Sequence, residues 1–322
     1  MRHALVTGGA GFVGSHLVDR LLAEGWQVTV IDNFDPFYDP ALKRANIAKH
    51  TDFTSYELLH IDIRDLDGMR SRLSSDYDVI VHFAAKAGVR ASLAHPAVYE
   101  EVNIRGTQNL LELARERRIG QFIFISSSSV YGINPRVPWK ENDSLLPVSP
   151  YGATKAAGEI LGHVYSRLYG IRFIALRLFT VYGPRQRPDL AIHKFARKML
   201  NGEKIPIYGD GSASRDYTYV EDVINGVRAA MDYRDSDYEV INLGNNRRVS
   251  LLEMVRTLEA VLGCKAELDF QPLQPGDVPH TWADVTKAEK LLGYRPLTPF
   301  SEGIKRFVAW LIEQDVLRKV AP

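Results

Sequence analysis

A serine run and a tyrosine–lysine pair are the residues of this chain best suited to acid–base chemistry. Ser127 and Ser128 follow a β-branched apolar run, and Tyr151 and Lys155 come later, four positions apart. Residues at this spacing lie on one face of a helix. A phenol with a pKa near 10 is a poor base at pH 7, but a neighbouring ammonium favours the phenolate. The pattern predicts removal of a proton from a substrate alcohol, although such a pair found alone would more often be a core tyrosine and a surface lysine.

A glycine-rich turn near the N-terminus indicates a cofactor for that chemistry. Thr7-Gly-Gly-Ala-Gly-Phe-Val-Gly14 lies between an apolar run and a stretch with helical periodicity. In a dinucleotide site, such a turn lets the first N–H groups of the helix face a pyrophosphate. Asp32 ends the next apolar run, eighteen residues past Gly14, where a carboxylate would bind ribose hydroxyls and repel a 2′-phosphate. We therefore expect NAD rather than NADP, with a turn cap as the alternative role of Asp32.

The expected NAD site continues along the ends of the following strands. Asp62 could reach the adenine amino group, or it could be an ordinary residue of a strand-end turn. The expected cofactor contacts are Gly8, Gly11, Phe12, Val13, Gly14, Asp32, Asn33, Asp62, Ile63, Phe83, Ala84, Ala85, Lys86, Tyr151 and Lys155.

These residues require a parallel sheet to bring them together. The first half of the chain alternates short apolar runs with stretches of helical spacing, which is typical of a doubly wound Rossmann-like α/β sheet buried on both faces. We expect strands at Ala4–Thr7, Gln27–Ile31, Ser55–His60, Val79–Phe83, Phe122–Ser126 and Arg172–Leu178. We expect helices at Phe12–Glu24, Leu66–Leu73, Val98–Arg117 and Ser149–Tyr169.

The alternation breaks after about Phe179, where glycine, proline and tyrosine cluster. We expect a smaller C-terminal α/β lobe there. The predicted NAD-binding domain is 1–178 with about 220–245, and the predicted nucleotide-sugar-binding domain is 179–219 with 246–322. Expected helices in this half are Ile192–Asn201, Val220–Met231, Leu251–Leu262, Thr286–Leu292 and Pro299–Gln314, with strands at Val240–Leu243 and Ala266–Phe270.

Composition excludes several classes of partner. Lys and Arg total 40 against 39 Asp and Glu, so no strong field would attract a nucleic acid. The single cysteine, Cys264, fits a reducing compartment, so we expect a cytoplasmic protein. No apolar run is long enough for a bilayer, and the residues after Met1 are too mixed for a signal peptide. The nine histidines have no close ligand spacing, so we expect no metal and regard His82 as a core residue.

These motifs, together with Ser214-Arg-Asp-Tyr217, resemble the extended short-chain dehydrogenase/reductase family of nucleotide-sugar enzymes over essentially the whole chain. The resemblance implies NAD in the N-terminal lobe and a nucleoside-diphosphate sugar in the C-terminal lobe. It implies that Asn103 lines the catalytic pocket and that Arg215 binds a phosphate. It further implies a homodimer, with the helices 98–117 and 149–169 of two chains forming a four-helix bundle. The catalytic residues it implies are Tyr151 as the base, Lys155 as the group that lowers its pKa, and Ser127 and Ser128 as proton-transfer residues.

The residues before Val130 distinguish among members of the family. Dehydratases carry Thr-Asp-Glu there and decarboxylases carry a glutamate, whereas this chain has Ser127-Ser-Ser129. Elimination of water needs an acid–base pair, so the serines fit an enzyme that only oxidises and re-reduces its substrate.

Four further segments, 33–40, 87–90, 180–189 and 274–278, resemble UDP-glucuronate 4-epimerases in particular. The resemblance implies that Thr180 and Arg187 recognise the sugar carboxylate, which suits the planar fork of a guanidinium. It implies interconversion of UDP-glucuronate and UDP-galacturonate through a transient 4-keto sugar, with NAD bound tightly. The implied substrate contacts are Arg90, Ser127, Thr180, Arg187, Tyr208, Arg215, Gln274 and Asp277.

Other interpretations stay open at this point. Arg185 and Arg187 could be solvated loop charges or phosphate contacts, and Tyr208 could be a core residue. The activity could be that of a UDP-hexose 4-epimerase or a UDP-glucuronate decarboxylase. A regulatory NAD-binding protein with the same fold is the alternative that is not an enzyme.

Overall fold

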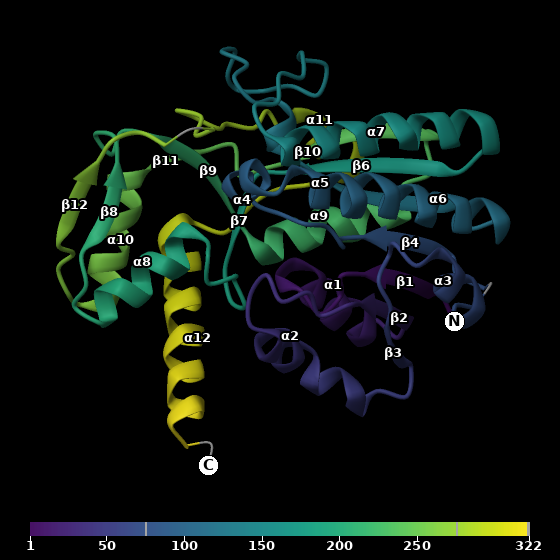
Figure 1. The fold of residues 1–322 in the computed structure, drawn as a ribbon, viewed down its shortest axis with the longest axis horizontal. Helices are drawn as coiled ribbons and strands as arrows, with labels where there is room; N and C mark the ends of the chain where they lie inside the picture. The colour runs from purple at the N-terminus through teal and green to yellow at the C-terminus, as the bar shows by residue number, and fades with distance from the viewer. Residues whose placement is uncertain (75, 275, 321–322) are drawn as a thin grey trace.

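A seven-stranded parallel sheet forms the centre of the larger lobe (Figure 1). The fold comes from a computed structural model that describes residues 1–74, 76–274 and 276–320, with side chains to residue 314; Pro275, in the 274–278 segment, lies outside them. The strand order β10-β6-β5-β4-β1-β2-β3 confirms the predicted doubly wound sheet. The strands are β1 (His3–Thr7), β2 (Gln27–Asp32), β3 (Tyr56–His60), β4 (Val79–His82), β5 (Gln121–Ser127), β6 (Arg172–Leu178) and β10 (Tyr238–Leu243).

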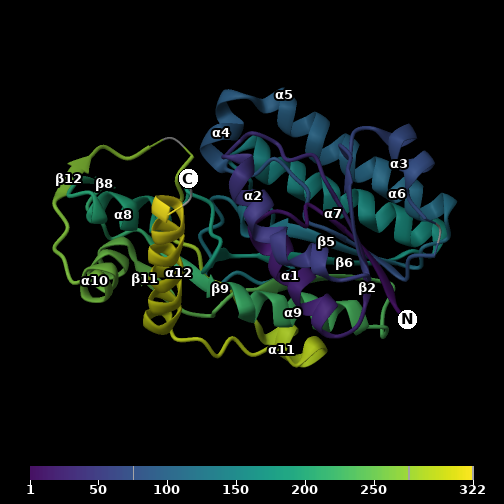
Figure 2. The same cartoon turned by 90° about the horizontal axis from the view of Figure 1, so that it is seen from below.

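Helices cover both faces of this sheet, as Figure 2 shows. One apolar core lies under α1 and α9, and the other lies under α3, α6 and α7. This two-sided cover explains why the central strands are apolar without alternation. The helices of this lobe are α1 (Phe12–Ala23), α2 (Pro40–Ile47), α3 (Leu66–Arg72), α4 (Val89–Ala94), α5 (Pro96–Tyr99), α6 (Gly106–Glu116), α7 (Pro150–Tyr169) and α9 (Val220–Asp232). Single turns complete it: the 3-10 turns η1 (Ala48–Asp52) and η3 (Ser128–Val130), and the π-helical η2 (Glu100–Arg105).

Two local features differ from the sequence prediction. The helix expected at 98–117 begins at Pro96 and runs through α5, the π-helical η2 and α6. The helix α2 was missed, although Asp39 and Pro40 mark its start: the Asp39 carboxylate accepts the Ala41 N–H at 2.9 Å. Asp at the N-cap and Pro at the first helical position form a recognisable start signal.

The smaller lobe contains two short sheets and three helices among the described residues. Strands β11, β9 and β7 form one sheet, and β12 and β8 form the other. The large core cluster continues from Leu17 in α1 to Phe307 in the last helix, so one apolar interior joins both lobes. The strands are β7 (Thr180–Tyr182), β8 (Ile205–Tyr208), β9 (Ser214–Tyr219), β11 (Arg248–Ser250) and β12 (Leu268–Gln271). The helices are α8 (Ala191–Leu200), α10 (Leu251–Leu262) and α12 (Phe300–Val320). Helix α11 (Thr286–Leu292) packs instead on β10 and α9 of the larger lobe. None of the helices in the described ranges has the length and apolar character that a membrane crossing requires.

A buried ion pair fastens α7 to the sheet. Arg177 of β6 donates to both carboxylate oxygens of Glu159 of α7, at 2.9 and 2.7 Å, and each side chain is 4% exposed. Ser126 of β5 donates to the same carboxylate at 2.5 Å. The helix can approach closely because Gly162 has no side chain: a Cβ there would lie 2.1 Å from the Phe173 ring.

Loss of one member of this pair should destabilise the protein strongly. In Glu159→Leu the Arg177 charge stays buried without its partner, which typically costs about 3–5 kcal/mol. Adding Arg177→Met should recover at least half of that loss, because the buried charge is then gone. The free energy of unfolding, measured by urea titration, checks both variants. Glu267→Gln, which removes an ion pair exposed on both sides, is the control and should cost less than about 1 kcal/mol. A loss of similar size in the control and in Glu159→Leu would contradict the argument.

Candidate active site

A cavity of about 510 Å³ runs along the carboxyl ends of the parallel strands and between the two lobes. All fifteen cofactor contacts expected from the sequence line it, from Gly8 to Lys155. Ser127, Ser128, Thr180, Arg187, Arg215 and Asp277 line it as well. Arg90, Tyr208 and Gln274 are not among its lining residues.

The start of α1 forms one end of the cavity. Its N-cap is Gly11, and no side chain caps the first N–H groups of the helix. Gly14 allows the helix to approach the turn, since a Cβ there would lie 2.4 Å from the Gly8 carbonyl oxygen. Uncapped N–H groups at the positive end of a helix dipole suit an anionic group such as a pyrophosphate.

Asp32 ends β2 and is buried beside this turn. Its carboxylate accepts the backbone N–H of Phe34 at 2.8 Å and that of Ala10 at 3.2 Å. The side chain therefore caps the turn and also lines the cavity. The two roles considered for Asp32 are compatible, because a carboxylate has about four acceptor positions.

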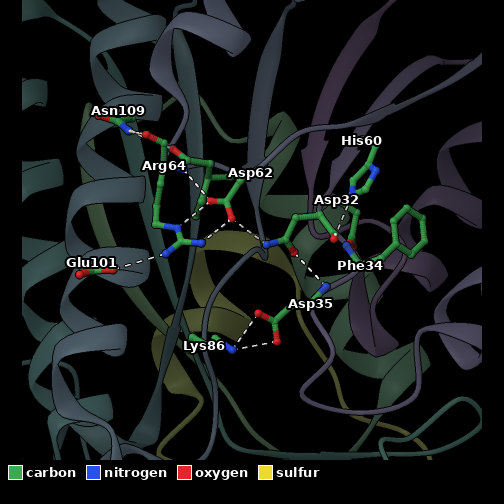
Figure 3. A network of polar contacts seen from close by, with 11 residues as sticks. Asp32, Phe34, Asp35, His60, Asp62, Arg64, Lys86, Glu101 and Asn109 are labelled. Carbon is green, nitrogen blue, oxygen red and sulfur yellow. Dashed lines mark hydrogen bonds and ion pairs between the residues drawn. The ribbon is translucent and has the colours of Figure 1, made fainter.

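A polar network continues from Asp32 along the cavity wall (Figure 3). The Asn33 amide donates to Asp62 at 2.8 Å, and the Arg64 guanidinium donates to the same carboxylate at 3.0 and 2.8 Å. These hydrogen bonds lower the pKa of Asp62 to about 2, and the one from Arg64 has the largest effect. Asp62 is thus an ionised acceptor at neutral pH, not only a turn residue.

The loop after β2 and the helix α2 add cavity residues that the sequence analysis did not identify singly. Asp35, Phe37, Tyr38 and Lys43 line the cavity. Asp35 forms an ion pair with Lys86 at 2.7 Å across the cavity wall. The sequence contained an indication of these residues, because three of the four lie in the 33–40 segment that carried the family resemblance.

The catalytic residues expected on α7 lie at its first turn. Ser149 is the N-cap, and its hydroxyl accepts the Gly152 N–H at 3.1 Å. Tyr151 is the second residue of the helix, and Lys155 lies one turn further on the same buried face. Burial raises the pKa of Tyr151, and the nearby Ser127 hydroxyl and the charge of Arg187 oppose that rise.

Lys155 was expected to lower the pKa of Tyr151, but its ammonium group contacts the backbone instead. Its Nζ donates to the Ile125 carbonyl at 2.7 Å, and burial lowers the pKa of the ammonium to about 7, opposed by Glu159. In this structure the cation that acts on the Tyr151 phenol is Arg187. The reason is geometric: the Lys155 ammonium is held against the end of β5.

The serines reach the cavity because β5 ends in the single 3-10 turn η3. Ser127 is the N-cap of that turn, and its Oγ accepts the Ser129 N–H at 3.1 Å. Asn103, by contrast, does not line the cavity as the family resemblance implied. Its amide lies behind the wall, where it binds the Lys86 backbone N–H and carbonyl at 2.8 and 3.0 Å and Thr154 at 3.0 Å.

The two arginines of the 180–189 segment have different surroundings. Arg185 adopts a left-handed backbone with φ 64 and pairs with Asp19 of α1 at 2.7 Å. Arg187 lines the cavity, its guanidinium lies 5.3 Å from the Phe37 ring centre, and its side chain is 17% exposed. Arg187 is therefore the arginine of this segment that can meet a ligand, and Arg185 joins the segment to the larger lobe.

At the opposite end, two expected substrate contacts gather around a third, Arg90. Its guanidinium pairs with Asp277 at 2.7 Å and lies 4.7 Å from the Tyr208 ring centre. Asp277 and Arg215 line the cavity, whereas Arg90 and Tyr208 lie beyond its lining. Gln274 is partly exposed and donates to the Pro272 carbonyl at 3.5 Å.

His82 is the last residue of β4. His82 is buried, and its two ring nitrogens contact Thr7 Oγ1 at 2.7 Å and Thr107 Oγ1 at 3.0 Å. Burial lowers its pKa well below the usual range, so it is a neutral core residue as predicted. Within 1–74, 76–274 and 276–314, no three His, Cys, Asp or Glu side chains gather in a way that could hold a metal ion.

Comparison with known proteins gives this geometry a family. The family model described as GDP-mannose 4,6 dehydratase matches residues 5–307. A UDP-glucuronate 4-epimerase of Thermodesulfobacterium geofontis is 38% identical over 99% of both chains. The solved UDP-glucuronic acid 4-epimerase of Bacillus cereus, in complex with UDP-glucuronic acid and NAD, is 39% identical with a TM-score of 0.91 over 97% of this chain and 99% of that one.

A solved UDP-glucose 4-epimerase of Thermotoga maritima, with UDP-glucose, is also similar: 34% identity and a TM-score of 0.90 over 97% of this chain and 99% of that one. The expected family resemblance is thus confirmed by sequence and by structure. The chain belongs to the GDP-mannose 4,6 dehydratase family of extended short-chain dehydrogenases/reductases.

Proposed function

We propose that this chain is a UDP-glucuronate 4-epimerase, which interconverts UDP-glucuronate and UDP-galacturonate. The observation that carries the proposal is the position of Arg187: a largely buried guanidinium that lines the same cavity as Tyr151 and acts electrostatically on its phenol. Guanidinium is the side-chain group best matched to a carboxylate, and carbon 5 beside the reacting carbon carries one in UDP-glucuronate. The relatives described above support the same substrate.

We infer NAD as the cofactor, with the start of α1 holding its pyrophosphate and Asp32 its adenosine ribose. The uncapped α1 N-terminus, the close turn at Gly14 and the Asp32 carboxylate fit these groups. The cofactor supplies a hydride acceptor that returns the hydride within the same turnover. The expected cofactor contacts of the sequence analysis are proposed as this site.

The residues of the chain then transfer the proton and orient the sugar. Tyr151 takes the proton of the 4-hydroxyl, directly or through the hydroxyl of Ser127, which lines the same cavity. Ser128 faces the same cavity and is proposed to orient the sugar. A 4-keto sugar results; it turns its other face to the cofactor and regains the proton from Tyr151. No carboxylic acid follows Ser126 in η3, so the elimination named by the family description lacks its acid–base pair.

The substrate lobe is proposed to bind the nucleotide. Arg215 lines the cavity, and burial lowers the pKa of its guanidinium, a setting in which an anionic phosphate would be favoured. Asp277 lines the cavity for the uridine ribose, and Arg90, Tyr208 and Gln274 are proposed as outer contacts of the uracil end. This assignment goes with the domain division proposed from the sequence, 1–178 with about 220–245 against 179–219 with 246–322.

The outer face of α7 supports a proposed homodimer. Ile160, Val164 and Leu168 recur every four residues and are 64%, 41% and 68% exposed, so they form one apolar stripe on the side of the helix away from the sheet. Pairing this stripe with a second copy would bury it in the expected four-helix bundle of α6 and α7. We also propose a cytoplasmic location, which fits the single cysteine.

The activity itself is tested by incubating the purified protein with UDP-glucuronate, without added NAD, and following the sugar protons by NMR. UDP-galacturonate should appear, because the cofactor is regenerated in every cycle. Tyr151→Phe should lower turnover by at least about a thousandfold, because the general base is lost. The NAD content of this variant, read from the absorbance of the denatured protein, should match that of the parent.

Two results would contradict this assignment. Conversion of UDP-glucose but not UDP-glucuronate would make the protein a neutral-hexose epimerase, and a decarboxylated UDP-pentose as the main product would make it a decarboxylase. Absence of any turnover with NAD present would favour the regulatory alternative.

Arg187→Ala should weaken binding of UDP-glucuronate by about ten- to a hundredfold, the loss of a charge-assisted hydrogen-bonded pair. It should also raise the share of decarboxylated product. The 4-keto intermediate is a β-keto acid, which loses carbon dioxide when the breaking bond aligns with the carbonyl π orbital, and a clamped carboxylate is kept out of that alignment. Affinity by calorimetry and product ratios by NMR check both effects.

Arg295→Ala is the control, because it removes an arginine whose side chain is 72% exposed and which the site does not use. Its product ratio should equal that of the parent. Equal ratios and affinities in Arg187→Ala and the parent would overturn the carboxylate role.

The homodimer is tested by placing charge on the apolar stripe. Val164→Arg with Leu168→Arg should convert a particle of twice the chain mass into one of the chain mass, because two copies would bring four arginines into one bundle. Light scattering after gel filtration measures the mass. Leu297→Arg, at a leucine 78% exposed between α11 and α12, is the control and should leave the mass unchanged. A parent protein of single-chain mass would contradict the proposal.

A further inference from the structure

Arg187 already has a carboxylate partner within the chain. Its Nε donates to Oδ1 of Asp189 at 2.9 Å, and its Nη2 donates to Oδ2 at 2.7 Å. Asp189 is not among the residues that line the cavity, and its side chain is 37% exposed against 17% for Arg187. The carboxylate therefore lies behind the guanidinium, on the side away from the ligand.

This pairing determines which edge of the guanidinium remains for a ligand. Arginine has five N–H donors in a planar fork, and Asp189 takes the Nε–H and one N–H of Nη2. Among the described residues, no other hydrogen bond to this guanidinium is formed, so the edge between Nη1 and Nη2 still offers two parallel N–H groups. A second carboxylate can bind there in the same bidentate manner.

The backbone around Arg187 is held independently of Asp189. His16 of α1 contacts the Pro184 carbonyl at 3.0 Å, and Arg185 pairs with Asp19 at 2.7 Å. Helix α8 begins at Ala191, directly after the segment. Since the chain is fixed on both sides, Asp189 controls the orientation and the charge of the guanidinium rather than the position of the loop.

The proposed reaction makes a particular demand on this arginine. The 4-keto sugar must turn its other face to the cofactor, and its carboxylate must leave the first binding geometry before it can take up the second. An arginine that bound the substrate carboxylate alone would keep its hold while the sugar rotates. A second, fixed carboxylate on the same guanidinium offsets part of its attraction for the substrate.

We propose that Asp189 is a positioning residue for Arg187: it holds the Nη1–Nη2 edge toward the cavity and weakens the hold on the sugar carboxylate enough for the intermediate to turn. The inference rests on the proposed epimerase function and specifies how its carboxylate site works. It predicts that removing the Asp189 charge tightens binding and slows turnover, whereas mere structural damage would weaken binding.

The test uses Asp189→Asn in the full-length protein with its bound NAD. Asparagine has nearly the same shape and keeps one acceptor for the guanidinium, but it carries no charge. The Kd for UDP-glucuronate, measured by calorimetry, should fall by about three- to tenfold, the effect of one partly exposed charge on a neighbouring pair. The Kd for UDP should stay within about twofold of the parent value. The factor by which kcat falls should be at least as large as the factor by which the Kd for UDP-glucuronate falls.

Two further variants make the outcome decisive. Asp189→Glu retains the negative charge and should keep the Kd for UDP-glucuronate within about twofold of the parent. Glu203→Gln removes a carboxylate from another ion pair of the smaller lobe, with Lys198, and should leave Kd and kcat unchanged. If Asp189→Asn fails to fold, Asp189→Glu and Asp189→Ser are compared in its place.

An unchanged or raised Kd for UDP-glucuronate in the neutral variant would overturn the proposal, as would an unchanged kcat with tighter binding. Failure of the epimerase function is distinguishable, because the parent protein would then give no UDP-galacturonate whatever Asp189 does.

Discussion

The close packing of α7 against the sheet is the constraint on which the rest of the site depends. Gly162 allows the approach, and the buried Arg177–Glu159 pair fixes the helix along its axis. Tyr151, Lys155 and Glu159 follow one another at intervals of four residues, so one buried face carries the base, the ammonium and the anchor. Because the anchor lies two turns from the base, a shift of the helix at Glu159 would move Tyr151 relative to Ser127. Stability and proton transfer are therefore determined by the same contacts.

The cavity wall holds most of its charged groups in pairs, which is the physical requirement for burying them. Asp35 pairs with Lys86, Asp62 with Arg64, and Arg187 with Asp189. Lys155 differs: its direct partner is a backbone carbonyl, and the pKa of its ammonium falls to about 7 as a result of burial. A group with a depressed cationic pKa can lose its proton near neutrality, so the positive charge beside the end of β5 is lost as the pH rises through that value. The permanently charged Arg187 does not change in this range.

Sequence reasoning succeeded where the determining interactions are local. The strand, glycine turn and α1 are specified by adjacent residues, and so is the helical spacing of Tyr151 and Lys155. It was less successful where distant segments decide. Asn103 forms its hydrogen bonds to Lys86 and Thr154 behind the wall, and only the folded chain brings these three together. Likewise Arg185 and Arg187 are two positions apart with the same chemistry, and the partner Asp19 on a distant helix is what separates their roles.

The segment that carries Arg187 also links the two proposed binding sites. It follows β7 in the smaller lobe, yet His16 and Asp19 of α1 hold it to the helix proposed to bind the pyrophosphate. The Phe37 ring, from the loop after β2, lies against the guanidinium. The proposed carboxylate site is thus fixed relative to the cofactor site by contacts from both α1 and β2. If the arginine cannot move away from the cofactor, inversion at carbon 4 requires the sugar itself to turn inside the cavity. An enzyme of this kind must hold its intermediate firmly enough to retain it and loosely enough to let it rotate, and the shared guanidinium of Arg187 is suited to that balance.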